Sequence, residues 1–170
     1  MNLIFRLVCV LVSSAFSKTR TSIMDVHALW FFVLPNDLDT NLHMNNGRYL
    51  TIMDLGRMDA LLRSGLIKKI VTEKWMPVIA GVSMIYRRSL SPFERYRLET
   101  HLIGWDERWI YMEQSFFRKN GDVAARGYVK ATFLKPSLRV ATSDIAAAAN
   151  FSGTSPALPP EILALFQKGV

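Results

Sequence analysis

The segment DLDTNLHMNNGRY, residues 37–49, concentrates side chains that can carry out acid–base chemistry. A carboxylate can act as a nucleophile or as a general base on water, and an imidazole can relay a proton. Because the side chains of an extended segment alternate between two faces, polar groups at alternate positions are expected to share one face. The pattern predicts an acyl-transfer site, and its five polar groups within nine residues are Asp37, Asp39, Asn41, His43 and Asn45.

A long helix is expected to begin directly after this segment. Asn45 and Asn46 are residues that commonly cap a helix N-terminus, and residues 47–63 follow without a proline. The first N–H groups of a helix have no partner within it, and the helix dipole makes that end positive. Such amides can polarise a carbonyl or stabilise a developing oxyanion.

A purely structural interpretation of the same residues stays open. The two aspartates could close turns, Asn45 could only cap the helix, and His43 could be a core residue with satisfied hydrogen bonds. A simple turn needs only one or two polar side chains, however, and the segment holds five. The number of polar groups therefore favours a functional site.

The composition limits the other kinds of chemistry. A single cysteine, Cys9, excludes an internal disulfide and a cysteine-rich zinc site. The histidines show no metal-type pairing, so we expect no metal. The net charge of +7 predicts a surface that attracts anions, such as anionic lipid or a cofactor that carries phosphate. Nucleic acid is disfavoured because no RNA-binding signature is present.

One α+β domain can position the site, since 170 residues suffice for a domain of ordinary size. Residues 26–34 predict a buried strand, residues 47–63 a deeply buried helix, and four strand-like segments follow, with an Asn-Gly turn at residues 120–121. Tight connections require a mainly antiparallel sheet of about five strands. The sheet must wrap around the helix, which is apolar on nearly all sides, and Gly56 would let it approach the helix backbone closely.

Two terminal segments flank this domain, which we place at residues 23–136. Residues 137–170 predict a tail with one short helix at residues 161–167. Residues 1–22 predict an apolar or amphipathic helix, in which the apolar run of residues 7–12 is too short to span a membrane. A narrow polar stripe and two basic residues suit an interfacial helix on anionic lipid; these residues are Asn2, Arg6, Ser13, Ser17, Lys18 and Arg20.

Other interpretations of the N-terminal segment are contact with a partner subunit and a secretory signal that is cleaved near residues 15–17. We favour a cytoplasmic protein with peripheral membrane association through residues 1–20.

The stretch DLDTNLHMNNGRYL resembles the signature of hotdog-fold acyl thioesterases, in which an Asp-x-Asp segment, a His-Met-Asn-Asn and a Tyr precede and open the central helix. The similarity is strongest to the branch of thioesterase superfamily member six and its bacterial relatives. It continues through MDLGRMDALLRSG, YRRSL-x-PF and LIGWDERWIYMEQ to the final strand, and so covers residues 26–135.

The resemblance implies a hotdog domain that works as a homodimer or homotetramer in lipid metabolism and hydrolyses acyl-CoA or acyl-carrier-protein thioesters. No cofactor is expected apart from coenzyme A as part of the substrate. The alternative is a membrane-associated hotdog protein that binds acyl thioesters or fatty acids without turnover.

The resemblance also assigns roles to individual residues. Similarity to 4-hydroxybenzoyl-CoA thioesterases of the aspartate type points to Asp37 as the nucleophile or base. The plant acyl-carrier-protein thioesterases have an Asp-x-Asn-x-His triad, which matches Asp39, Asn41 and His43, and we favour that assignment. Leu42 stands where a glycine often precedes the histidine, which argues against a backbone role that needs positive φ.

Substrate-binding residues follow from the same resemblance and from the basic surplus. Arginine and lysine at the mouth of a tunnel would bind the phosphates of coenzyme A. The candidates for substrate contact are Asn45, Asn46, Tyr49, Asp54, Arg57, Arg87 and Arg88, with Lys130 as a further basic candidate.

Overall fold

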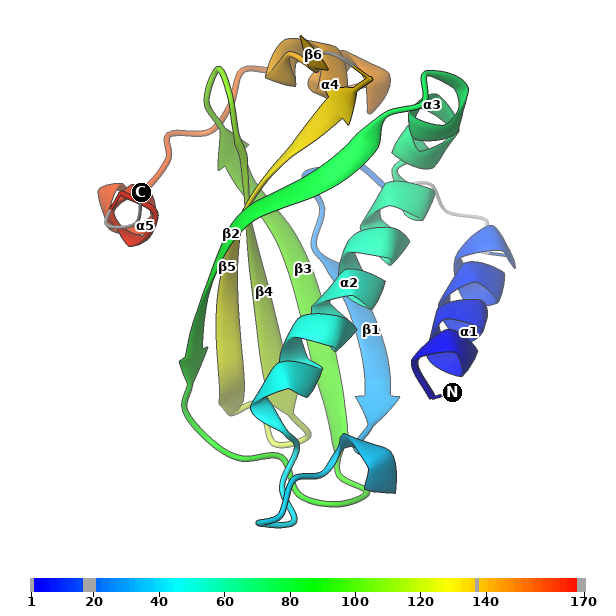
Figure 1. Cartoon of the computed structure of the whole chain (residues 1–170), viewed down its shortest axis with the longest axis vertical. Helices are drawn as coiled ribbons and strands as arrows, with labels where there is room; N and C mark the ends of the chain where they lie inside the picture. The colour runs from blue at the N-terminus through cyan, green and yellow to red at the C-terminus, as the bar shows by residue number, and fades with distance from the viewer. Residues whose placement is uncertain (1, 17–20, 137, 168–170) are drawn as a thin grey trace.

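A curled antiparallel sheet wraps around one long helix in the computed structural model, which describes residues 2–16, 21–136 and 138–167 (Figure 1). The strand order is β1-β3-β4-β5-β2, and a two-residue strand, β6, pairs with β5. The elements are α1 (Asn2–Phe16), β1 (His27–Phe32), the 3-10 turn η1 (Pro35–Asp37), α2 (Asn46–Arg63), α3 (Leu66–Thr72), β2 (Met76–Tyr86), β3 (Arg95–Trp105), β4 (Ile110–Arg118), β5 (Val123–Lys135), β6 (Leu138–Arg139), α4 (Thr142–Ala148) and α5 (Pro160–Leu165).

The predicted α+β architecture is confirmed, and the alternation of apolar and polar residues explains it. In β3, the side chains at alternate positions from Tyr96 to Leu102 are buried toward α2, while Arg97, Glu99 and His101 between them are more exposed. All pairings in the sheet are antiparallel, as the tight turns between consecutive strands require. The strand β2 pairs with β5 at one end of the strand order. The strand β2 therefore lies at one edge of the sheet, and β1 lies at the other.

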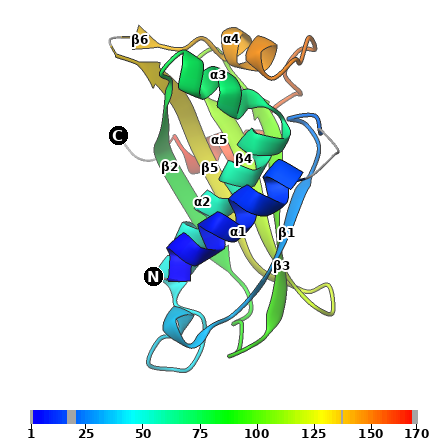
Figure 2. The same ribbon diagram turned by 90° about the vertical axis from the view of Figure 1, so that its right-hand side faces the viewer.

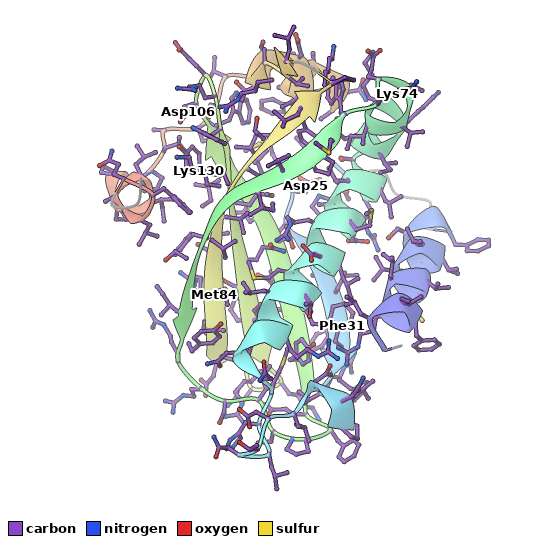
Figure 3. The ribbon with its side chains drawn as sticks, in the orientation of Figure 1. Asp25, Phe31, Lys74, Met84, Asp106 and Lys130 are labelled. Atoms are coloured by element: carbon purple, nitrogen blue, oxygen red, sulfur yellow. The ribbon has the colours of Figure 1, made fainter. Side chains whose placement is uncertain are left out.

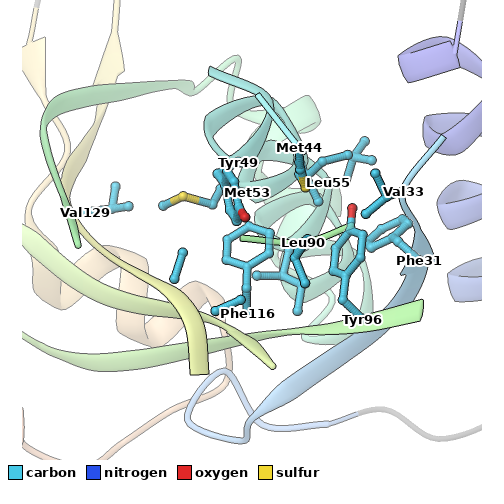
Figure 4. Packing of buried hydrophobic residues seen from close by; sticks show 14 of the residues in the cluster. Phe31, Val33, Met44, Tyr49, Met53, Leu55, Leu90, Tyr96, Phe116 and Val129 are labelled. Carbon is cyan, nitrogen blue, oxygen red and sulfur yellow. The ribbon is translucent and has the colours of Figure 1, made fainter. Parts of the chain in front are cut away.

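Aliphatic and aromatic side chains together form the core between α2 and the sheet (Figure 4). The Tyr49 ring packs edge-on against Phe116 at 4.9 Å and against Tyr86 at 5.3 Å between ring centroids. The predicted close approach at Gly56 is also found: a Cβ there would lie 2.5 Å from the Thr100 hydroxyl oxygen. These contacts fix α2 against the sheet and thereby fix the position of its N-terminus.

The helix α1 packs along α2 as part of the same folded unit (Figure 2). Val10 belongs to the main core cluster, and Arg6 and Ser14 are buried. Residues 2–16 therefore contribute to the domain that we had placed at residues 23–136. Among the described residues, no helix has both the length and the apolar character that a membrane span requires.

The C-terminal segment is more ordered than the predicted tail with one short helix. The structure has two helices there, α4 and α5. Val140, Ile145 and Ala149 belong to a second core cluster with α3 and the ends of the strands. The helix α5 lies on the outer face of the sheet, where the Phe166 ring packs against Gly81. Too few apolar residues lie in each short helix for a periodic pattern to reveal either contact.

Candidate active site

The segment of residues 37–45 forms a tight loop, so the prediction of an extended segment with one polar face is wrong. The turn η1 ends at Asp37, and Leu38 forms a bridge with Met44. The Asp39 N–H donates to the His43 carbonyl at 2.8 Å, and the Asn45 N–H donates to the Asp37 carbonyl at 2.8 Å. Pro35 begins the turn because its fixed φ suits the first helical position. The polar side chains consequently point in different directions.

Asp37 is enclosed beneath this loop and is only 1% exposed. Its Oδ2 lies 2.6 Å from Nη2 of Arg6 and accepts a hydrogen bond from the Leu34 N–H at 2.9 Å. Its Oδ1 lies 3.3 Å from Nε of Arg48. A charged side chain that is buried this deeply needs a partner of opposite charge, because an uncompensated buried charge strongly destabilises the fold. The Asp37 carboxylate, which the resemblance to 4-hydroxybenzoyl-CoA thioesterases suggests as the nucleophile, therefore lies between two arginine side chains and is shielded from solvent.

Asp39 lies two residues after Asp37 in the same loop and is partly exposed. Its Oδ1 accepts hydrogen bonds from the N–H groups of Asn41 at 2.8 Å and His43 at 3.3 Å. This is the usual turn geometry of an aspartate that binds the backbone two residues further on. These two hydrogen bonds use one of the two carboxylate oxygens of Asp39, and they hold the backbone of Asn41 and His43 close to it.

The side chains of Asn41 and His43 are exposed at the tip of the loop. The structural interpretation of His43 as a core residue is thus wrong, because its neighbours Leu38 and Met44 close the loop beneath it. Between the two lies Leu42, which is 66% exposed and has a φ of 58°. Leu42 therefore has a positive φ, although its side chain argued against one. This is the position where the resemblance to hotdog thioesterases leads one to expect a glycine.

A leucine in the left-handed region is strained, because its Cβ crowds the backbone. We expect Leu42→Gly to raise the free energy of unfolding by about 0.5–1 kcal/mol, the relief of strain less the extra flexibility of glycine in the unfolded chain. Urea unfolding would measure this difference. The matched control is Leu42→Ala, which removes the exposed side chain but keeps the strain; a gain as large in the alanine variant would contradict the explanation.

The N-terminus of α2 and two exposed arginines lie at the same end of the domain. Asn45 caps the helix, as predicted, by accepting a hydrogen bond from the Gly47 N–H at 2.8 Å. The Tyr86 hydroxyl donates to the Asn46 carbonyl at 3.1 Å and so fixes the end of β2 beside the helix. Arg87 and Arg88 follow directly and are exposed.

A second contact joins these two parts of the chain, because the Met44 N–H donates to the Leu90 carbonyl at 2.9 Å. The structure thus brings Arg87 and Arg88 to the same end of the domain as the loop that carries the triad.

A mainly apolar cavity of about 320 Å³ lies toward the other end of α2. The C-terminal half of α2, α3, α4 and the ends of the strands form its walls, and Met58, Leu102, Ile110 and Ala146 are among its lining residues. Burial lowers the pKa of His27, which also lines the cavity, so this imidazole is neutral at pH 7. The cavity therefore suits an uncharged, largely apolar group.

Asp54 and Arg57 lie on the wall of this cavity and form an ion pair within α2. The Arg57 Nη1 donates to Oε1 of Gln114 at 2.6 Å, and burial lowers the pKa of its guanidinium while Asp54 opposes that shift. The Gln114 side chain in turn donates to Thr100 Oγ1 at 2.9 Å. This network ties the helix to the sheet and occupies Arg57, which we had assigned to substrate phosphates.

Two further assignments from the sequence do not fit the structure. Tyr49 is 2% exposed and is a core residue, where burial raises the pKa of its phenol to about 12. Its position in the first turn of α2 turns the ring toward the sheet. Lys130 lies on the outer face of the sheet near α5, with Nζ 4.6 Å from the centroid of the Trp109 ring (Figure 3). Tyr49 thus faces the core, and Lys130 faces the outer side of the sheet.

Sequence reasoning missed the partners that hold the loop in place. Arg6 reaches Asp37 across 31 residues of sequence, and Arg48 reaches the same carboxylate from the first turn of α2. Arg6 carried a signal, because it is the one charged residue in the mainly apolar stretch of residues 2–16. A buried partner is a common reason for such a charge. In the described part of the chain, no three histidine, cysteine, aspartate or glutamate residues gather as metal ligands would.

Comparison with known proteins gives a family and a fold for this chain. A model of the thioesterase-like superfamily matches residues 33–166. The protein THEM6 of Xenopus laevis is 40% identical over 96 residues, which are 56% of this chain and 46% of that protein. The chain thus spans about half the length of the relatives that it matches.

Solved structures show the same fold at low sequence identity. The probable thioesterase YbaW from Escherichia coli superposes with a TM-score of 0.68 at 18% identity, over 72% of this chain and 95% of that one. SAV2348 from Staphylococcus aureus, solved in complex with CoA, has a TM-score of 0.65 at 16% identity and covers 85% of this chain and 96% of that one. The curled sheet around α2 is the hotdog fold, and the chain belongs to the thioesterase-like superfamily.

Proposed function

We propose that this protein is an acyl thioesterase that hydrolyses acyl-CoA, or acyl-carrier-protein, thioesters to a free acid and a thiol. The observation that carries the proposal is the pairing of two features along one helix. An exposed Asp-Asn-His loop with two arginines lies at the N-terminus of α2, and an apolar cavity lies beside its C-terminal half. The first suits a polar reaction centre and the phosphates of a carrier, and the second suits an acyl group.

In the proposed reaction, Asp39 accepts a proton from a water molecule while that water attacks the thioester carbonyl carbon. The carbonyl oxygen becomes an oxyanion, and we assign its stabilisation to the Asn46 N–H, which is in the first turn of α2 at the positive end of the helix dipole. The carbon–sulfur bond then breaks, and the leaving thiolate takes a proton from the protonated Asp39 carboxyl. Asn41 and His43 orient the water and the thioester, and Arg87 and Arg88 bind phosphate groups.

A homodimer would bring the two features together. The strand β2 is at the edge of the sheet, and it exposes the apolar side chains of Ile79, Val82 and Tyr86. In an antiparallel pairing of two β2 strands, the Tyr86 end of one protomer lies beside the Met76 end of the other. The loop of one protomer would then face the cavity of its partner, and the acyl chain would cross between them.

The test is a panel of purified acyl-CoA substrates of increasing chain length, with thiol release as the readout. We expect Ala146→Phe, which fills the cavity from α4, to lower kcat/KM for long chains by about 10-fold or more while short chains are retained. The matched control is Ala147→Phe, because Ala147 lies next in α4 and is exposed. An unchanged chain-length profile in Ala146→Phe would place the acyl group elsewhere.

One observation favours a second candidate, a membrane-associated protein that binds acyl thioesters without turnover. The outer face of α1 carries large apolar side chains that are at least 50% exposed: Ile4, Phe5, Val8, Val12 and Phe16. An amphipathic helix with such a face can lie in a lipid interface, and two basic residues follow it in the sequence, Lys18 and Arg20.

Thermal stabilisation by acyl-CoA with no thiol release, together with co-sedimentation with anionic vesicles, would favour this candidate over the enzyme. Thiol release at any chain length would exclude its non-catalytic part.

A further inference from the structure

We propose that α1 is a working part of the active site, in which Arg6 is a positioning residue that fixes the loop of residues 37–45 through Asp37. The proposal rests on the proposed thioesterase function, since it assigns that loop to catalysis. Arg6 touches neither the loop tip nor the cavity, so it would act only through Asp37.

The contact between Arg6 and Asp37 is buried and has two hydrogen bonds. Nη2 of Arg6 lies 2.6 Å from Oδ2 of Asp37, and Nη1 lies 3.3 Å from Oδ1. The same Nη2 donates to the Phe32 carbonyl at 2.7 Å, and the guanidinium lies 5.8 Å from the centroid of the Phe31 ring. Two-pronged arginine–carboxylate pairs fix orientation as well as distance. Arg6 thus joins α1, the end of β1 and Asp37 in one arrangement.

Asp37 passes this constraint to the catalytic loop. Its carbonyl accepts the Asn45 N–H at 2.8 Å, so Asp37 closes the loop at its base and holds the residue that caps α2. Asp39 lies two residues further and binds the amides of Asn41 and His43. A shift of Asp37 would therefore move the proposed base and both of its partners relative to the helix N-terminus.

A second buried contact holds α1 at a distance from the loop. The Ser14 hydroxyl donates to Oδ1 of Asp59 at 2.5 Å, and Asp59 also pairs with Arg63 at 2.8 Å. Ser14 lies eight residues from Arg6, which is about two turns of helix, and both side chains are buried on the inner side of α1. This contact supplies a control, because it secures the same helix without touching the segment of residues 37–45.

The test compares Arg6→Met with Ser14→Ala in the full chain. We expect Arg6→Met to lower kcat for thiol release by 10-fold or more with KM little changed, because the base is misplaced while the substrate sites remain. We also expect hydrogen exchange at the amides of Asn41, His43 and Asn45 to accelerate by 10-fold or more. Arg6→Lys should restore part of both, because it keeps the charge but not the two-pronged geometry.

Ser14→Ala should lower the melting temperature and leave kcat and loop exchange unchanged. Equal changes in kcat and loop exchange in Ser14→Ala and Arg6→Met would overturn the proposal, because they would show that α1 only stabilises the fold. Faster loop exchange in Arg6→Met with an unchanged kcat would also overturn it.

Hydrogen exchange keeps this test separate from the test of function. If the wild-type protein releases no thiol, the proposed function fails, and the proposed catalytic role of Arg6 fails with it. The exchange comparison then still decides whether Arg6 fixes the loop, since it requires no turnover.

Discussion

Asp39→Asn is expected to lower kcat for thiol release by about 100- to 10,000-fold, the usual cost of losing a positioned general base. The fold should survive, because the oxygen of an asparagine side chain can still accept the hydrogen bonds that Oδ1 of Asp39 accepts from the Asn41 and His43 amides. Only the negative charge and the ability to take a proton are lost. Thiol release from acyl-CoA and a thermal melt of the same sample would measure both properties.

A second substitution at this position separates catalysis from turn formation. Asp39→Ala removes the turn hydrogen bonds as well as the base, so it should lose activity and also loosen the loop. If Asp39→Asn kept full activity while Asp39→Ala lost it, the carboxylate would serve the turn alone, and the proposed mechanism would be wrong.

Asp37→Asn is expected to lower the free energy of unfolding by about 3–5 kcal/mol, the usual cost of breaking a buried ion pair by removing one partner. The substitution leaves the guanidinium of Arg6, itself 6% exposed, without its carboxylate partner. It also removes the carboxylate that faces Arg48. Urea denaturation, followed by far-UV circular dichroism, would measure the loss.

Two controls make the result specific to the buried pair. Glu73→Gln breaks the exposed pair of Lys69 and Glu73 and should leave the urea midpoint nearly unchanged, because exposed pairs contribute little. The double variant Arg6→Met with Asp37→Asn removes one charge of each sign, so it should be less destabilised than the sum of the single variants. A single Asp37→Asn variant as stable as the wild type would contradict the assigned environment of Asp37.

The two aspartates show what the sequence could and could not predict about the site. The sequence singled out both acids and the helix cap, and the structure confirms Asn45 as the cap and places both acids in the segment before it. It could not rank Asp37 against Asp39, because their difference lies in a partner 31 residues away, Arg6. Alternation in sequence also implied one polar face, and the tight loop with its left-handed Leu42 removes that alternation.

The fold could be predicted from the sequence more completely than the site, and the reason is physical. The strands carry alternating apolar patterns, since each buries one side against the core, and the apolar residues on nearly all sides of the helix at 47–63 indicated that the sheet wraps around it. Gly56 was recognised because a glycine in a buried helix implies close packing. The cavity and the roles of α4 and Arg57 depend on how separate elements meet, and periodicity within one element contains no information about that.

The anchors of α1 also have a consequence for the order of events during synthesis. Ser14 is made 45 residues before Asp59, a delay of about 2 to 9 seconds at ordinary rates of translation. Throughout that interval the face of α1 that packs along α2 lacks this partner. The helix can therefore take up its final position only after α2 has been made, when both of its anchors are present.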